Sequence, residues 1–86
     1  MSEQQLRDLL TRLLHLSTPR FELEKLPGGK LAGSVISDTF VGMSDSERQK
    51  VIWDALENEL GAQATLSVSS LLAYTDAEWN VDLAET

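Results

Sequence analysis

FVGMSDSERQKVIW, residues 40–53, is the stretch that decides the fold of this chain. Ser44 is followed three residues later by Glu47, which is the pattern of a capping box and predicts that a helix begins here. The helix is predicted to reach Leu60 and to end at Gly61, because glycine is common just after a helix C-terminus. A Phe-x-Gly corner at residues 40–42 precedes it.

This helix carries two basic residues, and the question is whether they bind nucleic acid or belong to an ordinary charged surface. At about 100 degrees per residue, Val51, Ile52, Trp53, Ala55, Leu56 and Leu60 form one apolar arc. Lys50 falls among acidic residues, with Asp54 four positions ahead to neutralise it. Arg48 falls inside the apolar arc, in the first turn, where a cation opposes the helix dipole. Arg48 therefore either forms a structural ion pair or makes a binding contact, and the sequence leaves both open.

The flanking segments have clear starts and stops. Ser2 and Gln5 form another capping box, and leucines at helical spacing predict a helix from Ser2 to His15. Residues 21–25 alternate as a half-buried strand, residues 27–30 form a turn, and residues 31–37 return as a second strand that Gly33 weakens. Residues 66–74 have the composition of a third strand, although its faces are not assignable. A capping box at residues 75–78 predicts a closing helical turn from Asp76 to Val81, with a frayed tail over residues 82–86.

Length and charge limit the class of protein. Eighty-six residues provide one modest core, so a single domain over residues 1–81 is expected. No apolar run is long enough for a membrane span, and a cytoplasmic location is the default expectation. The net charge is −7, and residues 44–86 hold the whole excess, with nine acidic residues against two basic ones. Such a charge distribution repels a phosphate backbone, so nucleic acid is an unfavoured partner.

No residue pattern indicates an enzyme. The chain has no cysteine, which excludes disulfides and thiolate chemistry. Its single histidine, His15, falls opposite the leucine stripe of the first helix and is expected in solvent. The carboxylates Glu22 and Glu24 and the serines at positions 67, 69 and 70 lack a partner base or nucleophile. Trp53 and Trp79 are expected as core and lid aromatics, and residues 28–29 as a hairpin turn.

The predicted order of helix, strand, strand, helix, strand and short helix is an α+β sandwich, with helices on one face of a three-stranded sheet. Three runs carry a resemblance to a known family: S-D-T-F-V-G at 37–42, Arg48-x-Lys50-x-x-Trp53, and A-Y-T-D-A-E-W at 73–79. Together they resemble the BolA family over most of the chain. The resemblance implies the BolA fold, which is similar to type II KH domains without their GxxG nucleic-acid loop.

The chain departs from that family at the metal ligands. BolA-like proteins usually carry a histidine at the position of Ser67, which helps a monothiol glutaredoxin hold a two-iron cluster together with a His or Cys from the loop between the first two strands. Here that loop, residues 26–30, contains neither, and a serine hydroxyl is a poor iron ligand because it loses its proton reluctantly. Gln49 and Lys50 also replace residues of the family's R-H-R motif. We therefore expect no metal and no cofactor.

The resulting hypothesis is a non-enzymatic protein-binding adapter or regulatory module of BolA-like type. Its partner is expected to be another protein, for which an apo monothiol glutaredoxin is one candidate, and homo-oligomers are compatible with the sequence. The alternative is a nucleic-acid-binding transcriptional regulator that uses the KH-like fold. The candidate partner-binding residues are Phe40, Gly42, Arg48, Lys50, Ser67 and Tyr74.

Overall fold

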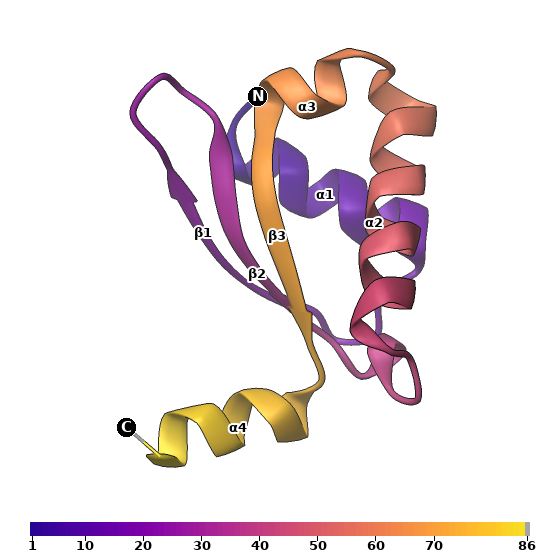
Figure 1. The fold of residues 1–86 in the computed structure, drawn as a ribbon, viewed down its shortest axis with the longest axis vertical. Coiled ribbons are helices and arrows are strands. Elements are labelled where there is room, and N and C mark those ends of the chain that lie inside the picture. The colour runs from indigo at the N-terminus through magenta and orange to yellow at the C-terminus, as the bar shows by residue number, and fades with distance from the viewer. Residues whose placement is uncertain (86) are drawn as a thin grey trace.

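The computed structural model describes the backbone of residues 1–85 and the side chains of residues 1–80, and its centre is a three-stranded sheet (Figure 1). The strands are β1 (Arg20–Lys25), β2 (Leu31–Ile36) and β3 (Val68–Tyr74), in the spatial order β1-β2-β3. β1 pairs antiparallel with β2, and β2 pairs parallel with β3. Both β1 and β3 are therefore edge strands, and the expected α+β class is confirmed.

Helices α1 (Glu3–Leu14) and α2 (Asp45–Leu60) cover one face of the sheet (Figure 1). Both begin at the predicted capping boxes, in which Ser2 pairs with Gln5 and Ser44 pairs with Glu47. The predicted ends are confirmed as well, because His15 and Gly61 cap the two helices with positive φ values of 51° and 58°. None of the helices in the described part of the chain combines the length and apolarity that crossing a membrane requires.

The core lies between these helices and the sheet. It holds three leucines of α1, together with Ile52 and Leu56 of α2. Burial of such side chains contributes about 1.5–3 kcal/mol each, and this contribution holds the layers together. The sheet and its connections supply the other core residues: Leu16, Leu31, Val35, Phe40, Ala64, Val68, Leu71 and Ala73.

The third strand differs from its prediction at its start. Residues Gln63–Ser67 form a short helix, α3, so β3 begins at Val68 and not at Leu66. The sequence gives little sign of α3, because no side chain caps it and its anchor is the burial of Ala64 in the core. Only the packing of the folded chain stabilises so short a helix.

A β-bulge explains why the faces of β3 are unreadable in the sequence. Val68 pairs with Leu31, but Ser70 pairs with the next residue, Ala32, so Ser69 is an extra residue. The bulge shifts the alternation by one position, and Val68 and Leu71 both reach the core. Beyond the bulge, Leu72 and Tyr74 point to the opposite face of the sheet from Leu71.

The chain ends in helix α4 (Asp76–Glu85), which is longer than predicted. The expected helix stops near Val81 and is followed by a frayed tail, whereas α4 continues to Glu85, and Thr86 lies outside the described residues. Leucine, alanine and glutamate at positions 83–85 are good helix formers, so the helix started by the capping box continues. Figure 1 shows α4 leaving the end of β3 and extending away from α1 and α2.

Candidate functional site

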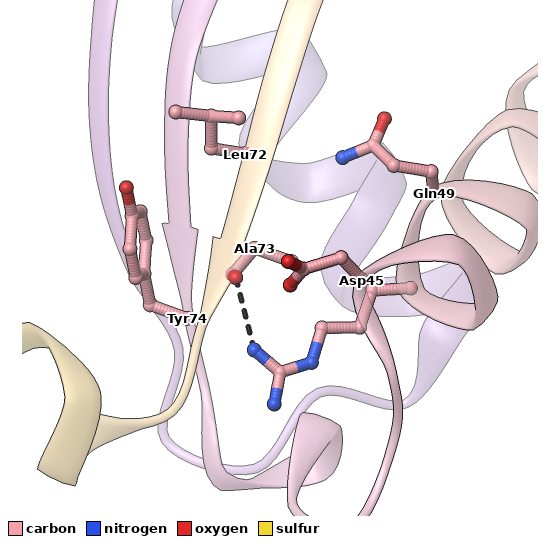
Figure 2. Close-up of a pocket in the computed structure, with 6 residues that line it drawn as sticks. Asp45, Gln49, Leu72, Ala73 and Tyr74 are labelled. Carbon is pink, nitrogen blue, oxygen red and sulfur yellow. Dashed lines mark hydrogen bonds between the residues drawn. The ribbon is translucent and has the colours of Figure 1, made fainter.

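A pocket of 260 Å³ opens between the first turns of α2 and the second half of β3 (Figure 2). α2 contributes Asp45, Arg48 and Gln49, and β3 contributes residues 72–74. The strand edge and the helix N-terminus meet here because the corner at residues 40–43 turns the chain directly into α2. Two of the predicted binding residues, Arg48 and Tyr74, therefore line one pocket.

Arg48 is buried, with 5% of its surface exposed. Its Nη1 donates to the carbonyl oxygen of Ala73 at 3.1 Å and to Glu78 Oε1 at 2.7 Å, and its Nη2 donates to Glu78 Oε2 at 3.3 Å. Of the two alternatives that the sequence leaves open, the structural ion pair is thus present. The remaining donor, Nε, is buried and has no hydrogen-bond partner among the described residues.

Glu78 joins this ion pair to the start of α4. Its carboxylate accepts from the backbone N–H of Thr75 at 2.8 Å, and its own N–H donates to Thr75 Oγ1 at 3.2 Å, which completes the predicted capping box. The hydrogen bond from Arg48, followed by the one from the Thr75 backbone, lowers the pKa of Glu78 to about 2. The same carboxylate thus caps α4 and ties it to α2.

We predict a loss of stability in acid that depends on Glu78. The pKa of Glu78 is about 2 in the folded chain, below the ordinary 4.5. Its contribution to the free energy of unfolding is therefore complete above pH 4.5 and disappears as the pH falls toward 2. Urea unfolding between pH 2 and pH 6 measures this decline, and Glu78→Gln should flatten it relative to the native chain. An unchanged pH profile in Glu78→Gln would mean that other carboxylates cause the loss.

Gln49 is a pocket residue whose role the sequence does not reveal. Its side-chain amide donates to the carbonyl oxygen of Leu71 at 2.6 Å. Together with the bond from Arg48 to Ala73, side chains of α2 thus satisfy two carbonyl groups along the β3 edge. An exposed strand edge offers such groups to other chains, so these two contacts occupy it in part.

Lys50 lies on the outer surface of α2, as predicted. Its Nζ donates to Asp54 Oδ2 at 2.7 Å, and this hydrogen bond and the charge of Asp54 raise the pKa of Lys50. Both basic residues of α2 are thus matched to carboxylates, so this helix presents no unpaired positive charge to a phosphate backbone.

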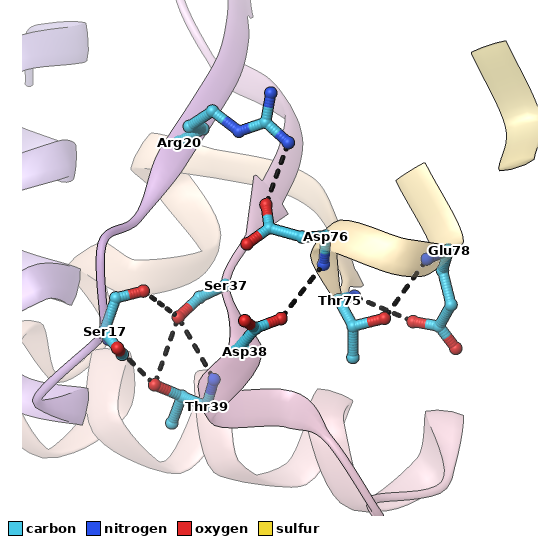
Figure 3. Close-up of polar contacts among 8 residues, drawn as sticks. All are labelled: Ser17, Arg20, Ser37, Asp38, Thr39, Thr75, Asp76 and Glu78. Atoms are coloured by element: carbon cyan, nitrogen blue, oxygen red, sulfur yellow. Dashed lines mark hydrogen bonds and ion pairs between the residues drawn. The ribbon is translucent and has the colours of Figure 1, made fainter. Parts of the chain in front are cut away.

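A network of short polar contacts fixes the end of the sheet beside the pocket (Figure 3). Asp76 accepts from Arg20 of β1 at 2.8 Å, and its backbone N–H donates to Asp38 Oδ1 at 3.3 Å. The buried hydroxyl of Ser37 donates to the carbonyl oxygen of Ser17 at 2.9 Å. These contacts hold α4 and the segment after α1 against the end of β2.

The other predicted residues lie elsewhere. Phe40 is 1% exposed and its side chain belongs to the core, so the exposed apolar residue of the corner is Val41. Gly42 has a φ of +81°, with open space where a side chain would extend. Trp53 packs against the core, as predicted, and Trp79 meets Tyr74 edge to face at 5.3 Å.

Ser67 lies at the opposite end of β3 from the pocket. It directly precedes Val68, whose strand partner is Leu31, and so lies beside the loop that joins β1 to β2. β3 has seven residues, which at about 3.3 Å per residue separate the two ends by roughly 20 Å. The predicted binding residues thus do not form one site. Among the described residues, no group of three or more His, Cys, Asp or Glu side chains is arranged to hold a metal ion.

No protein-family model and no curated protein matches the chain. Solved structures do match over nearly all of it. A bol-like protein from Babesia bovis has a TM-score of 0.64 at 15% sequence identity, and the match covers 96% of this chain and 94% of the Babesia chain. A bolA protein homologue from Coxiella burnetii has a TM-score of 0.64 at 20% identity, covering 93% and 97%.

The BolA domain of SufE1 from Arabidopsis thaliana has a TM-score of 0.64 at 23% identity, covering 91% of this chain and 98% of its own. These matches agree with the strand order, the mixed pairing and the two helices on one face. The chain therefore has the fold of the BolA-like proteins, which confirms the architecture that its sequence motifs implied.

Proposed function

We propose that this chain is a non-enzymatic, protein-binding module of BolA-like type that has lost iron–sulfur ligation. The observation that carries the proposal is the chemistry at Ser67. The register of β2 and β3 brings this residue beside the loop at residues 26–30, where a BolA-like protein would assemble its ligands. In this chain the loop and Ser67 offer a hydroxyl and the ammonium group of Lys30.

Neither group suits a two-iron cluster. A hydroxyl must lose its proton to become a good ligand, and an ammonium group adds positive charge where a metal would bind. His15 does not compensate from within the same chain. It is exposed and lies two residues before Ser17. Ser17 is hydrogen-bonded to Ser37 and Thr39, which follow the end of β2 that is far from Ser67.

Protein binding is the function that requires neither a free catalytic group nor unpaired positive charge. A catalytic site would need a nucleophile beside a free base, but Arg48 of the pocket is engaged with Glu78, and among the described residues no Ser, Cys or His side chain lines the pocket beside Asp45. The alternative function, nucleic-acid binding, would need unpaired positive charge, and the two cations of α2 are paired. The proposal includes the cytoplasmic location expected from the sequence.

The test is a titration of the purified protein into cluster-loaded monothiol glutaredoxin, followed by visible circular dichroism and calorimetry. We expect no change in the cluster spectrum. This expectation holds whether or not calorimetry detects binding that involves no ligand to the cluster. A shifted cluster spectrum with the native chain would contradict the loss of ligation.

A matched variant gives the experiment a positive control. Ser67→His combined with Lys30→His places an imidazole at each of the two positions, both outside the core. We expect this double variant to change the cluster spectrum where the native chain does not. A different result is that neither the native chain nor the double variant changes the cluster spectrum and neither releases binding heat. In that case the chain has no glutaredoxin partner, and the adapter function must involve another protein.

A further inference from the structure

We propose that the pocket between α2 and β3 binds an extended, positively charged segment of a partner protein, whose main-chain carbonyl accepts a hydrogen bond from Arg48 Nε. This inference rests on the proposed protein-binding function and names the kind of partner. It concerns the end of the sheet opposite Ser67, so it is tested separately from the loss of metal ligation.

The buried Nε of Arg48 is the first observation that points to a ligand. Arg48 lines the pocket, and its other two guanidinium nitrogens donate to Ala73 and Glu78, while Nε lacks an acceptor. Leaving a buried donor unsatisfied costs about 1–3 kcal/mol. A partner's oxygen reaches the buried Nε only when the side chains around it move apart on binding, and accepting from Nε then recovers this free energy in the complex.

The neighbouring strand edge favours an extended peptide as the source of that oxygen. Partner segments commonly add to a sheet by pairing along an edge strand, and β3 is an edge strand. In Figure 2 the side chain of Gln49 extends from α2 toward β3, and Arg48 of the same helix donates to the carbonyl oxygen of Ala73. Because Gln49 already donates to Leu71, a backbone N–H of an incoming strand can replace its amide without leaving that carbonyl unpaired.

The shape and lining of the pocket agree with one stretch of peptide. Its volume of 260 Å³ lies below the range of about 300–1,000 Å³ that is typical for drug-sized ligands. Leu72 lines the pocket and is 54% exposed, so the rim offers an apolar contact for a side chain of the partner. Such a contact gives affinity that the main-chain hydrogen bonds alone lack.

Charge decides which peptide is favoured. The positive charge of Arg48 is matched by Glu78, whereas Asp45 lines the pocket, is exposed, and forms no ion pair with the described residues. The whole chain carries a net charge of −7, which attracts basic segments and repels acidic ones. A main-chain carbonyl is neutral, so it supplies the acceptor for Nε without adding negative charge beside Asp45.

The experiment uses a capped synthetic peptide of alternating lysine and valine, five residues long, and the same peptide with glutamate in place of lysine. The ¹H–¹⁵N spectrum of the labelled full chain contains a separate cross peak for Arg48 Nε–H. We expect the lysine peptide to move that cross peak and the amides of residues 71–73, and to bind at least tenfold more tightly than the glutamate peptide.

Three variants locate the binding. Arg48→Lys keeps the charge that faces Glu78 but removes the Nε donor, and we expect at least a tenfold loss of peptide affinity. Leu72→Ser removes the apolar contact and should weaken binding about threefold, whereas Leu66→Ser, a matched exposed leucine on α3, should not change it. If Arg48→Lys fails to fold, the Nε cross peak of the native chain still decides the question.

The proposal is overturned if the lysine peptide leaves the Nε cross peak in place, if both peptides bind equally, or if neither binds. It is also overturned if an eight-nucleotide oligouridine moves these resonances and the peptide does not, since the groove would then bind nucleic acid. An unchanged cluster spectrum in the glutaredoxin titration together with any of these results would leave the loss of ligation standing and remove only the peptide site.

Discussion

Gly33→Ala is expected to reduce the free energy of unfolding by about 3 kcal/mol, because backbone atoms of β1 occupy the space that a Cβ atom at this position would need. A Cβ atom added here would overlap the carbonyl oxygen of Glu22 and crowd the Cα of Leu23. These are backbone atoms of the paired strand, so no side-chain rotation relieves the overlap. Either the two strands separate or the methyl group is accommodated by strain at a φ of +151°.

Thermal unfolding measures this effect. In a domain of this size, 1 kcal/mol corresponds to about 4–8 °C in melting temperature, so a decrease of roughly 12 °C or more is expected. Gly42→Ala is the matched control, since Gly42 also has a positive φ but has open space around the missing side chain. Its cost should be about 1 kcal/mol, from backbone conformation alone. Equal losses in the two variants would show that the close approach at Gly33 is not rigid.

Arg48→Met is expected to be the second largest loss, at about 2–3 kcal/mol. The substitution keeps an apolar stem in the packed position but removes the bonds to Ala73 and Glu78. The carbonyl of Ala73 then lacks a donor and α4 loses its link to α2. The larger loss of stability that follows from breaking a fully buried ion pair is not expected here, because the Glu78 side chain is 47% exposed and water replaces part of the interaction.

A double-mutant cycle with Glu78→Gln isolates the ion pair from the rest of the Arg48 contacts. The two losses should be clearly less than additive, since each substitution removes the same interaction. Lys50→Gln is the control for a cation on the same helix, and it should leave the urea midpoint unchanged because the pair with Asp54 is exposed. Additive losses would mean that Arg48 stabilises the fold through packing alone.

The sequence predicts well whatever depends on neighbours in the chain. The capping boxes at Ser2 and Ser44, the glycine stop at residue 61 and the apolar arc of α2 involve residues at most a few positions apart. Their geometry is therefore set once the local backbone is helical. The same arc places Arg48 against the core, so the need for a compensating carboxylate is visible in the sequence, although its identity is not.

Features that join distant segments required the tertiary structure. Arg48 meets Glu78 across 30 residues, and Gln49 meets the carbonyl of Leu71 across 22. The bulge at Ser69 and the burial of Ala64 depend on how β3 lies against β2 and the core. Many partners at such separations are compatible with one local pattern, and only the packed arrangement of all the elements selects among them.

The sequence by itself thus determined the order of the main elements, where α1 and α2 begin and end, the excess of negative charge and the absence of the usual ligand at Ser67. Only the tertiary structure decided that Arg48 is held by Glu78, that its Nε is left without an acceptor in a pocket, and that Ser67 lies at the other end of β3. The physical reason is that local hydrogen bonds and periodicity specify helices, whereas strand register and buried ion pairs arise from contacts that form only when the whole chain is folded.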